Sequence, residues 1–325
     1  MPKISPADLS DFNPADIIQE VHPDMSSLTC FPTPLPEESL YSIFCRYHIR
    51  SCNNCDSTTI SQLFDQCRSL QTSILSPRPL KHAREWIDTT PGFNRSSLML
   101  DHTAYPFFRS FIPNPNPKFS SYAADRFFLS LYLNCSTSSK RLRYCPKCAS
   151  AQLKTFGTSY WQILPQINGY EICPVHLVPI QETDILHTDI VHRFFPASHV
   201  LAEYKSFKDP VRLDWINSHW KDFLQMAQDI EYIFRLSASG LLLGTKIRRV
   251  LLYNLLPVRS GWEYTLLKDS VIDYCGNEDH INFLASLYRD HYKLATQIPF
   301  LPAFLQLRIC RLLFGDIRRF VMRKV

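Results

Sequence analysis

Two short cysteine motifs constrain the fold of this chain more than any other feature of its sequence. The first is Cys-Pro-Lys-Cys at 145–148, and the second, after a gap of 24 residues, is Cys-Pro-Val-His at 173–176. A Cys-x-x-Cys turn lets two side chains reach one ion from a single bend, and the proline in each motif stiffens that bend. Two such turns supply the four ligands that tetrahedral Zn²⁺ prefers. The sequence therefore predicts a closed structural zinc site made of Cys145, Cys148, Cys173 and His176.

The gap between the motifs is slightly longer than the ~15–20 residues usual in a zinc ribbon. Gly157 and Gly169 lie within it, and a hairpin or a short helix can bring the second pair back to the first. A redox Cys-Pro-Lys-Cys of the thioredoxin type is one alternative, but it needs a βαβ context and no second pair. Four unrelated buried side chains are the other alternative. Four protein ligands leave no position for water, so we expect a structural metal.

A second Cys-x-x-Cys, from Cys52 to Cys55, has no matching pair nearby. His48 and Cys67 could complete a metal site on paper, but two loop cysteines are the favoured interpretation. Three histidines follow the second zinc motif without a cysteine pair, and we interpret them as ordinary surface or core residues: His187, His192 and His199.

The composition disfavours several classes of function. The 325 residues include only 8 glycines, and neither GxxxxGK[ST] nor GxGxxG occurs, which argues against a nucleotide-hydrolysing core. No HExxH or comparable acid cluster supports a zinc enzyme such as a nuclease. Eleven cysteines without an N-terminal apolar signal are typical of a reducing cytoplasm. No apolar run reaches ~18 residues, so no membrane span is expected.

Charge is distributed unevenly along the chain, although the net charge of +5 is modest. Residues 1–30 carry five acids against one lysine, and no acid occurs between Asp125 and Glu171. The last 23 residues hold six basic residues against Asp316. The chain thus has an acidic arm, a basic middle and a basic end. We expect the arm to dock on another surface of the protein or on a basic partner.

Helical periodicity dominates the rest of the chain. Leu40, Ile43, Phe44 and Tyr47 recur at helical spacing, and a polar turn near 51–54 separates them from a second helix at 58–66. The pair is helix-turn-helix-like, although any helical hairpin gives this pattern. Further helices are predicted at 81–87, 96–112, 120–133, 215–234, 246–256, 280–295 and 303–324.

The predicted fold class is therefore mainly α, with a helix-turn-helix-like N-terminal helical domain, a central zinc ribbon and a C-terminal helical domain. Four units are expected: an acidic arm at 1–30, a helical domain at 31–134, a zinc-finger unit at 135–200 and a C-terminal helical domain at 201–325. The last helix is cationic and amphipathic, and it could lie on a membrane. Packing into the body is favoured, through the face that carries Phe304, Leu307, Leu312 and Phe320.

Basic side chains on the helices and around the zinc unit are the candidates for contact with DNA. Contacts to phosphates position a protein, whereas reading a sequence needs side chains on a helix in the major groove. The candidates for reading are Arg46 and Arg50 on the first helix, with the helix at 58–66. The candidates for backbone contact are Lys140, Arg141, Arg143, Lys147, Lys154, Arg248, Arg249, Arg308, Arg311, Arg318 and Arg319. For each arginine, a solvated face is the alternative.

Three stretches of the chain resemble the TniQ/TnsD family, the target-selection proteins of certain bacterial DNA transposons. They are FPTPLPEESLYSIFCRYH at 31–48, DHTAYPFFRSFIP at 101–113, and RYCPKC…GTSYWQ…ICPVH at 143–176. The last stretch includes Gly157, Tyr160 and Trp161 between the two zinc motifs. Together the three stretches cover roughly residues 31–180.

The resemblance implies a function that the residues alone do not. Proteins of this family bind a chosen target and recruit a AAA+ ATPase regulator, which brings in the transposase. The family carries zinc on the four residues that match the two motifs. TnsD-type members recognise a chromosomal DNA site themselves, whereas short TniQ-type members ride on a CRISPR effector complex. This chain is shorter than full-length TnsD-type proteins.

The resemblance thus implies a non-enzymatic protein of the bacterial cytoplasm and nucleoid that marks an insertion site on double-stranded DNA. The alternative is a TniQ-type adaptor that links a CRISPR effector complex to the ATPase with little direct reading of DNA. We expect the acidic arm and the first helices to meet the ATPase.

Overall fold

The computed structural model describes residues 28, 30–64, 94–111, 140–203, 210–237 and 303–322, with isolated positions at 74, 75, 79, 80, 83, 87, 243, 244 and 246. The predicted helices at 120–133 and 280–295 lie outside the described residues. Most residues of the predicted helices at 81–87 and 246–256 also lie outside them. The described part is mainly helical, with two small two-stranded sheets.

The predicted N-terminal helical pair is present as α1 (Leu40–Arg50) and α2 (Asp56–Leu63). The Ser39 side chain caps α1 by accepting a hydrogen bond from the Ser42 amide at 3.2 Å. All four apolar positions that the periodicity predicts on α1 are buried. The second helix ends earlier than predicted, because Phe64 adopts an extended backbone and bridges to Ala83.

The prediction of a single helix at 96–112 is wrong, because two helices occupy this stretch: α4 (Arg95–Asp101) and α5 (Tyr105–Ser110). The Thr103 hydroxyl donates to the Met99 carbonyl at 2.6 Å and accepts from the Tyr105 amide at 3.1 Å. Pro106 has no N–H with which to continue the helical hydrogen bonds across the break. The side chain of Thr103 and this proline therefore end one helix and start the next.

The segment from 140 to 203 contains the two zinc motifs and both sheets. Strand β1 (Arg141–Tyr144) pairs antiparallel with β4 (Gln181–Leu186), and β2 (Ile172–Cys173) pairs antiparallel with β3 (Val178–Pro179). A helix, α7 (Pro146–Phe156), and a 3-10 turn, η5 (Leu164–Gln166), fill the gap between the motifs. The second motif therefore lies on a β-hairpin, β2–β3, whereas the first motif leads into a helix, α7. The segment ends in η6 (Asp189–Val191) and α8 (Ala197–Glu203).

The described C-terminal residues are mainly helical, with α9 (Pro210–Ser218), α10 (Trp220–Ser237), α15 (Ala303–Phe314) and α16 (Ile317–Met322). The prediction of one helix over 215–234 is wrong, because a turn at His219 separates α9 from α10. The prediction of one helix over 303–324 is wrong, because Gly315 adopts a positive φ of 73° between α15 and α16. The Asp316 carboxylate then accepts from the Arg318 amide at 2.8 Å. Leu307 and Phe320 are fully buried, which confirms that these two residues pack into the body.

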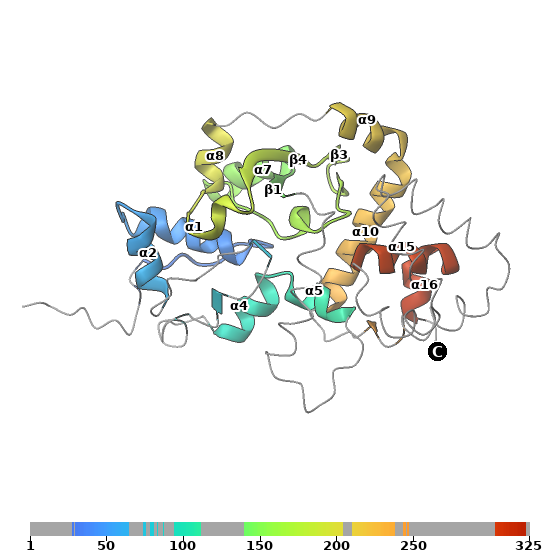
Figure 1. Cartoon of the computed structure of the whole chain (residues 1–325), viewed down its shortest axis with the longest axis horizontal. Coiled ribbons are helices and arrows are strands. Elements are labelled where there is room, and N and C mark those ends of the chain that lie inside the picture. The colour runs from blue at the N-terminus through green and yellow to red at the C-terminus, as the bar shows by residue number, and fades with distance from the viewer. Residues whose placement is uncertain are drawn as a thin grey trace, which may run out of the picture.

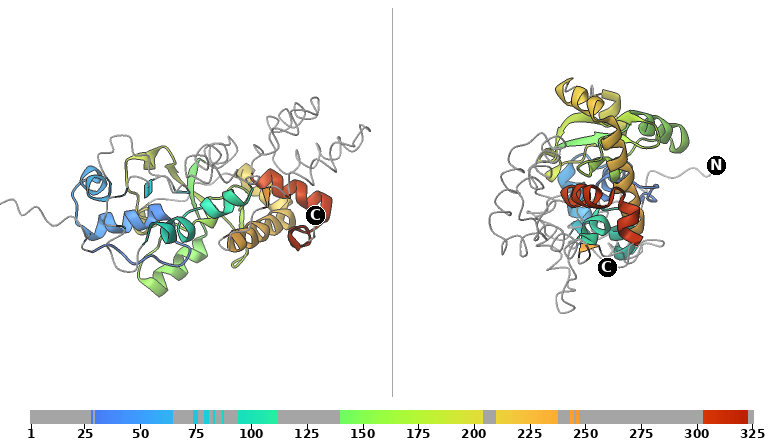
Figure 2. Two further views of the ribbon diagram at one scale, coloured as in Figure 1. Left: turned by 90° about the horizontal axis from the view of Figure 1, so that it is seen from below. Right: turned by 90° about the vertical axis from the view of Figure 1, so that its right-hand side faces the viewer.

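α1 and α2 lie at one end of the described structure and α15 and α16 at the other, with α4, α5 and the zinc segment between them (Figure 1). In both views of Figure 2, α7 stands out from the side of the body. Within the described ranges, no helix combines the length and apolar character needed to cross a bilayer.

Two hydrophobic cores cross the boundaries of the predicted units. One core joins α1 and α2 to Leu142, Trp161 and Ile185 of the zinc segment. The other joins α5 to the β2–β3 hairpin and to α10, α15 and α16, and α10 packs directly on α5 and β2. The four-unit division remains a prediction, but the zinc segment shares a core with the helices on each side of it.

Candidate metal centre and nucleic-acid surface

The two motifs meet in the structure and bring four ligand atoms together. The donor atoms of Cys145, Cys148, Cys173 and His176 all lie within 4.8 Å of one another. The His176 Nδ1 atom lies 3.3 Å from the Cys148 Sγ atom and 3.6 Å from each of the other two sulfurs. The Sγ atoms of Cys148 and Cys173 are 3.8 Å apart.

These distances match a tetrahedral zinc site. Bonds of about 2.3 Å to sulfur and about 2.0 Å to nitrogen, at tetrahedral angles, place sulfurs about 3.8 Å apart and sulfur about 3.6 Å from nitrogen. Cys145 and Cys173 are buried, and the other two ligands are partly buried. The four residues could therefore hold a metal ion in a closed site.

The metal site also anchors the start of α7. Cys145 is the N-cap residue of this helix, and its sulfur accepts from the Cys148 amide at 3.5 Å. Pro146 occupies the first turn, where its missing N–H costs nothing. Gly157 ends the helix with a left-handed φ of 70°. Both ligands of the first motif thus lie in the first turn of a helix of defined length.

A buried ionic network joins the two motifs behind the metal site. The Arg143 guanidinium, which is only 1% exposed, lies 3.1 Å from the Glu171 carboxylate and donates to the Tyr170 carbonyl at 2.5 Å. Burial alone raises the pKa of Glu171, but attraction to Arg143 and Arg212 outweighs burial and holds that pKa below its usual value. This carboxylate is therefore charged, and it neutralises an arginine that has no access to water.

Arg212 of α9 extends this network to the C-terminal helices. Its guanidinium binds both the Glu171 carboxylate and that of Glu182 on β4. Elsewhere α9 is only lightly packed, with Val211 79% exposed and Ile216 buried. The side chain of Arg212 is therefore a main attachment of α9 to the zinc segment.

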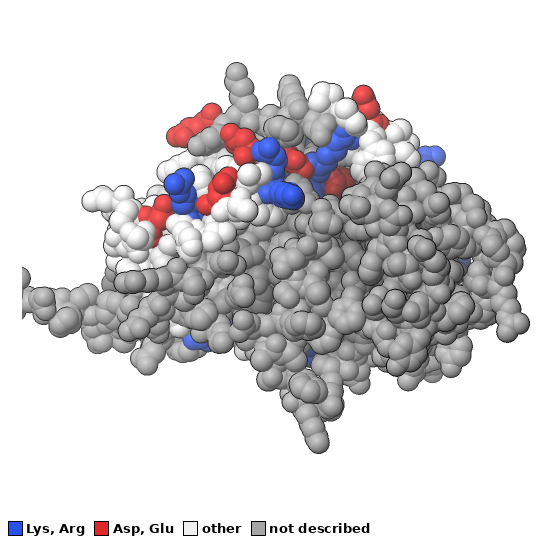
Figure 3. Space-filling view, viewed as in Figure 1, with Lys and Arg blue, Asp and Glu red and all other residues white. Residues whose placement is uncertain are grey.

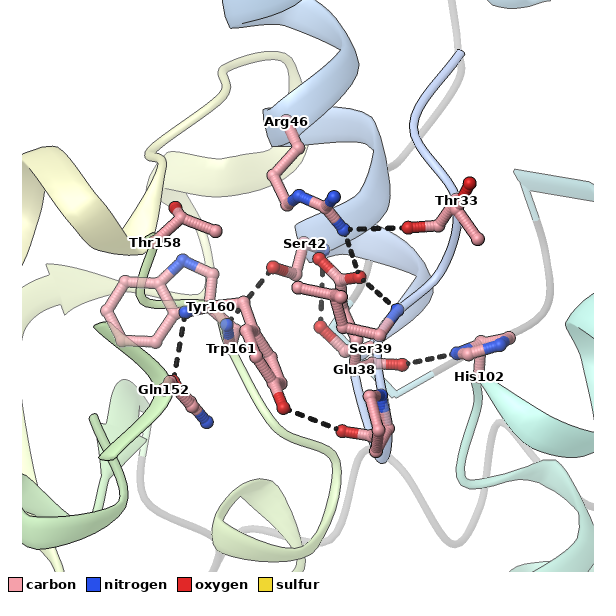
Figure 4. Close-up of polar contacts among 12 residues, drawn as sticks. Thr33, Glu38, Ser39, Ser42, Arg46, His102, Gln152, Thr158, Tyr160 and Trp161 are labelled. Carbon is pink, nitrogen blue, oxygen red and sulfur yellow. Dashed lines mark hydrogen bonds and ion pairs between the residues drawn. The ribbon is translucent and has the colours of Figure 1, made fainter. Parts of the chain in front are cut away.

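The residues that carry the family resemblance meet around Glu38 (Figure 4). The Glu38 carboxylate is fully buried and lies 2.6 Å from Arg46, and its backbone carbonyl lies 2.7 Å from His102 Nδ1. Burial raises the pKa of Glu38 in spite of Arg46, and burial lowers the pKa of His102. The first and second stretches of the resemblance are thus joined through one buried acid.

The third stretch reaches the same point through Tyr160 and Trp161. The Tyr160 hydroxyl donates to the Pro36 carbonyl at 3.0 Å, and burial raises its pKa to about 12. The Trp161 amide donates to the Ser42 hydroxyl at 3.1 Å, and its indole N–H donates to the Phe195 carbonyl at 2.7 Å. These residues fasten the zinc segment to α1, which is a structural task.

Two of the arginines that we interpreted as DNA contacts are engaged inside the protein. Arg143 is buried against Glu171, so its interpretation as a phosphate contact is wrong. Arg46 is 13% exposed and donates to the Glu38 carboxylate and to the Thr33 carbonyl. Its guanidinium is therefore bound within the protein and is not presented to a DNA groove. The cause is the same in both cases, because each arginine neutralises a buried glutamate.

The remaining basic candidates fall into four groups. Arg308 and Arg311 are 11% and 17% exposed and lie beside Asp222 and Asp229, whereas Arg248 and Arg249 lie outside the described residues. Arg141 is partly buried and donates to the Asp184 carbonyl at 2.9 Å. Six candidates are exposed: Arg50, Lys140, Lys147, Lys154, Arg318 and Arg319.

The acid-free stretch of the sequence is not an acid-free surface. Antiparallel pairing places Glu182 of β4 opposite Arg143, and Asp184 follows it on the same strand. On the face shown in Figure 3, Lys and Arg side chains alternate with Asp and Glu. Among the described residues on this face, basic and acidic side chains are therefore mixed and are not gathered into one cationic patch.

The outer face of α7 is the most uniform cationic feature near the metal site. Lys147, Ser150, Ala151 and Lys154 are all exposed, and their spacing of three, four and seven residues places them on one side of the helix. Both lysines are among the predicted DNA contacts, but their alignment on one side of a helix was not predicted. The seven-residue spacing of the lysines was the available signal.

None of the other described cysteines and histidines joins this four-residue cluster. Cys52 and Cys55 are exposed in the turn between α1 and α2, in agreement with loop cysteines. Among the described residues, the cluster at the two motifs is the only group of His, Cys, Asp and Glu with the spacing of a metal site.

Comparison with known proteins agrees with the resemblance. Residues 29–180 match the TniQ family model. The chain is also 23% identical over 186 residues to the Escherichia coli protein named "Transposon Tn7 transposition protein TnsD". That alignment covers 54% of this chain and 36% of the relative, so the chain matches about a third of the relative's length.

Proposed function

We propose that this chain is a non-enzymatic target-selection protein of a bacterial transposon. On this proposal it binds double-stranded DNA at the insertion site, in the bacterial cytoplasm and nucleoid, and recruits a AAA+ ATPase regulator. The match of residues 29–180 to the TniQ family model is the observation that carries the proposal. The similarity to a protein named for transposition supports it.

We further propose that the four-residue cluster binds a structural Zn²⁺. The fit of its sulfur and nitrogen distances to tetrahedral geometry supports this assignment. Bound zinc would supply a cross-link between the first turn of α7 and the β2–β3 hairpin. Cys145 and Cys148 would then hold the start of the helix, while Cys173 and His176 hold the hairpin against it.

In this proposal, α7 is the element that faces DNA. It projects from the body (Figure 2), and its outer side carries a lysine at each end with Ser150 and Ala151 between them. A helix with small residues on its outer side can approach a groove closely, and a major groove about 12 Å wide admits a helix. Lys147 and Lys154 would contact phosphates and position the chain, and Ser150 lies where a side chain reaches base edges.

The other exposed basic residues would extend this contact along the DNA backbone. They are Arg50, Lys140, Arg318 and Arg319, which come from three separate parts of the described chain. α2 is a poorer candidate for reading DNA than α7. Its sequence, DSTTISQL, carries no basic residue and has an acid in its first turn.

The test is a salt titration of DNA binding with the Lys147→Ala/Lys154→Ala variant, using duplexes of random and candidate chromosomal sequence. Each lost phosphate contact reduces the slope of log affinity against log salt by about 1. We therefore expect the slope of the double variant to fall by about 2. An unchanged slope would exclude α7 from the DNA contact.

The matched control removes two exposed basic residues from α10, as Lys221→Ala/Arg235→Ala. It has the same net charge as the double α7 variant, so a non-specific charge effect would change both slopes equally. A difference between the two variants assigns the contact to α7.

The alternative is an adaptor that links a CRISPR effector complex to the ATPase with little direct reading of DNA. Four exposed aliphatic and aromatic side chains of the zinc segment favour a protein partner there: Leu153, Phe156, Val175 and Leu177. Weak binding to every duplex, independent of salt, would support the adaptor. Tight binding to one sequence with a steep salt slope would support direct target selection.

A further inference from the structure

The turn between α1 and α2 holds two exposed thiols outside the metal centre. Cys52 follows the end of α1 and has a left-handed φ of 51°, and Cys55 is the N-cap residue of α2. Both side chains are exposed. Only two residues separate the cysteines in the connection between the helices. A disulfide needs a Cα separation of roughly 4.4–6.8 Å, which a connection this short can adopt.

Cys55 is surrounded by hydrogen-bond donors. Its Sγ atom lies 3.1 Å from the Ser57 hydroxyl and 3.0 Å from the Thr58 hydroxyl. These hydroxyls, with the amides of the same two residues at the start of α2, lower the pKa of the Cys55 thiol to about 7. The thiolate is the reactive form of cysteine, and donors of this kind favour it.

Cys52 has a different environment. Its Sγ atom lies 3.9 Å from the Arg50 carbonyl oxygen, which accepts a hydrogen bond from the thiol. Cys55 is therefore the nucleophile of the pair, and Cys52 is the second thiol, which can close a disulfide with it.

The turn that carries the thiols is held in place by side chains. The Asn53 amide donates to the Thr59 hydroxyl at 2.9 Å and to the Gln62 amide oxygen at 2.7 Å. The Ser51 hydroxyl donates to the His48 carbonyl at 3.1 Å. The connection that carries the cysteines is therefore bonded to α1 on one side and to α2 on the other.

We propose that Cys52 and Cys55 form a peroxide-sensitive dithiol. The Cys55 thiolate attacks hydrogen peroxide, so that an S–O bond forms, the O–O bond breaks, and the departing hydroxide takes up the thiol proton as water. Cys52 then attacks the sulfenic sulfur, so that an S–S bond forms, the S–O bond breaks, and a second water leaves with the Cys52 proton. Peroxide receives two electrons, and the two thiols lose two hydrogens.

The disulfide would lock the connection between α1 and α2. Asp56, beside Cys55, accepts a hydrogen bond from the Phe194 amide at 3.2 Å and so links the start of α2 to the segment before α8. A covalent closure of the turn therefore acts on the junction between the helical pair and the zinc segment.

The test is peptide mapping by mass spectrometry after brief treatment of the zinc-loaded full chain with hydrogen peroxide at pH 7. We expect a Cys52–Cys55 cross-link in the wild type. In Cys52→Ser, we expect oxidation to stop at a sulfenic acid on Cys55 that dimedone traps. In Cys55→Ser, we expect Cys52 to stay reduced. No cross-link in the wild type, or equal oxidation of Cys52 without Cys55, would overturn the proposal.

Two controls separate the site from general thiol exposure. Thr58→Ala removes a donor to the Cys55 sulfur and should slow its oxidation several-fold, whereas Ser61→Ala removes an exposed hydroxyl of the same helix that donates to a backbone carbonyl. Cys30 is also exposed and serves as the internal reference. Equal rates for the two variants, or for Cys55 and Cys30, would contradict the proposed role of the donors.

Discussion

The Arg143 guanidinium lies 3.1 Å from the Glu171 carboxylate, and each of these residues stands two positions before the first cysteine of a metal-binding motif. The four candidate metal ligands and this buried ion pair thus lie on the same two segments of the chain. A folded metal centre and a paired Arg143 therefore depend on each other.

Replacing Glu171 with alanine should strongly destabilise the protein. The change leaves the buried Arg143 charge without its carboxylate, and breaking a buried pair in this way costs about 3–5 kcal/mol. Chemical denaturation of the zinc-loaded protein measures the loss. The control is Glu231→Ala, which removes the partner of Arg235 in an exposed pair and should cost about 0.3–0.5 kcal/mol. Equal losses in the two variants would contradict the importance of the buried pair.

Replacing Arg212 with methionine should loosen α9. The aliphatic part of the side chain is kept, but the bonds to Glu171 and Glu182 are lost. Hydrogen exchange should become faster over 210–218 while the metal content stays at one ion per chain. Arg235→Met removes an arginine that is 68% exposed on the adjacent helix, and it should leave exchange over 210–218 unchanged. If both variants behave alike, another contact holds α9.

Replacing Trp161 with alanine should unfold the junction between α1 and the zinc segment. Trp161 is fully buried, and removing a buried tryptophan side chain costs about 3–5 kcal/mol. The indole donor to the Phe195 carbonyl is lost as well. Thermal unfolding measures the change, with Phe156→Ala as the control, because Phe156 is 43% exposed. A Trp161 variant as stable as the control would argue against a structural role.

Replacing Cys148 with serine should weaken the metal site and the start of α7 together. Zinc prefers thiolate ligands, and this residue lies in the first turn of the helix. We expect less bound zinc after dialysis and faster hydrogen exchange over 146–156. Cys55→Ser, which changes a cysteine outside the cluster, should retain full zinc content. Full zinc content in the Cys148 variant would remove this residue from the ligand set.

The His187 side chain should make stability depend on pH. Burial, together with the charge of Arg143, lowers the pKa of His187 to about 4, and its Nε2 atom is enclosed. The unfolded chain binds this proton near pH 6.5, so the stability that the neutral ring provides is complete above pH 6.5 and is lost as the pH falls toward 4.

The measurement is the difference in unfolding free energy between wild type and His187→Leu at several pH values. It should shift against the wild type between pH 6.5 and 4, while His199→Leu, at an exposed histidine, should show no such trend. Acid release of metal affects each protein alike and cancels in the difference. A flat difference for His187 would mean that the ring is solvated.

Local sequence chemistry predicted the local structure well where side chains act over a few residues. The two motifs predicted the metal cluster, because a Cys-x-x-Cys turn brings its ligands together wherever the rest of the chain lies. The spacing of Leu40, Ile43 and Phe44 predicted α1 and its buried side. The breaks at Thr103 and Gly315 are also local, but they were missed because the apolar period continues through them.

The identity of the surface residues was decided by the tertiary structure alone. Arg143 and Lys147 stand four residues apart in one basic, acid-free stretch, yet the first is buried and the second exposed. Glu171 meets Arg143 only after the segment before the second motif folds back, and Glu182 lies opposite Arg143 only after β4 pairs with β1. Lys147 instead lies on the outer side of a helix that projects from the body. The sequence determined which charges the chain carries. The fold decided which of them face a partner, because the neutralising acids come from distant segments.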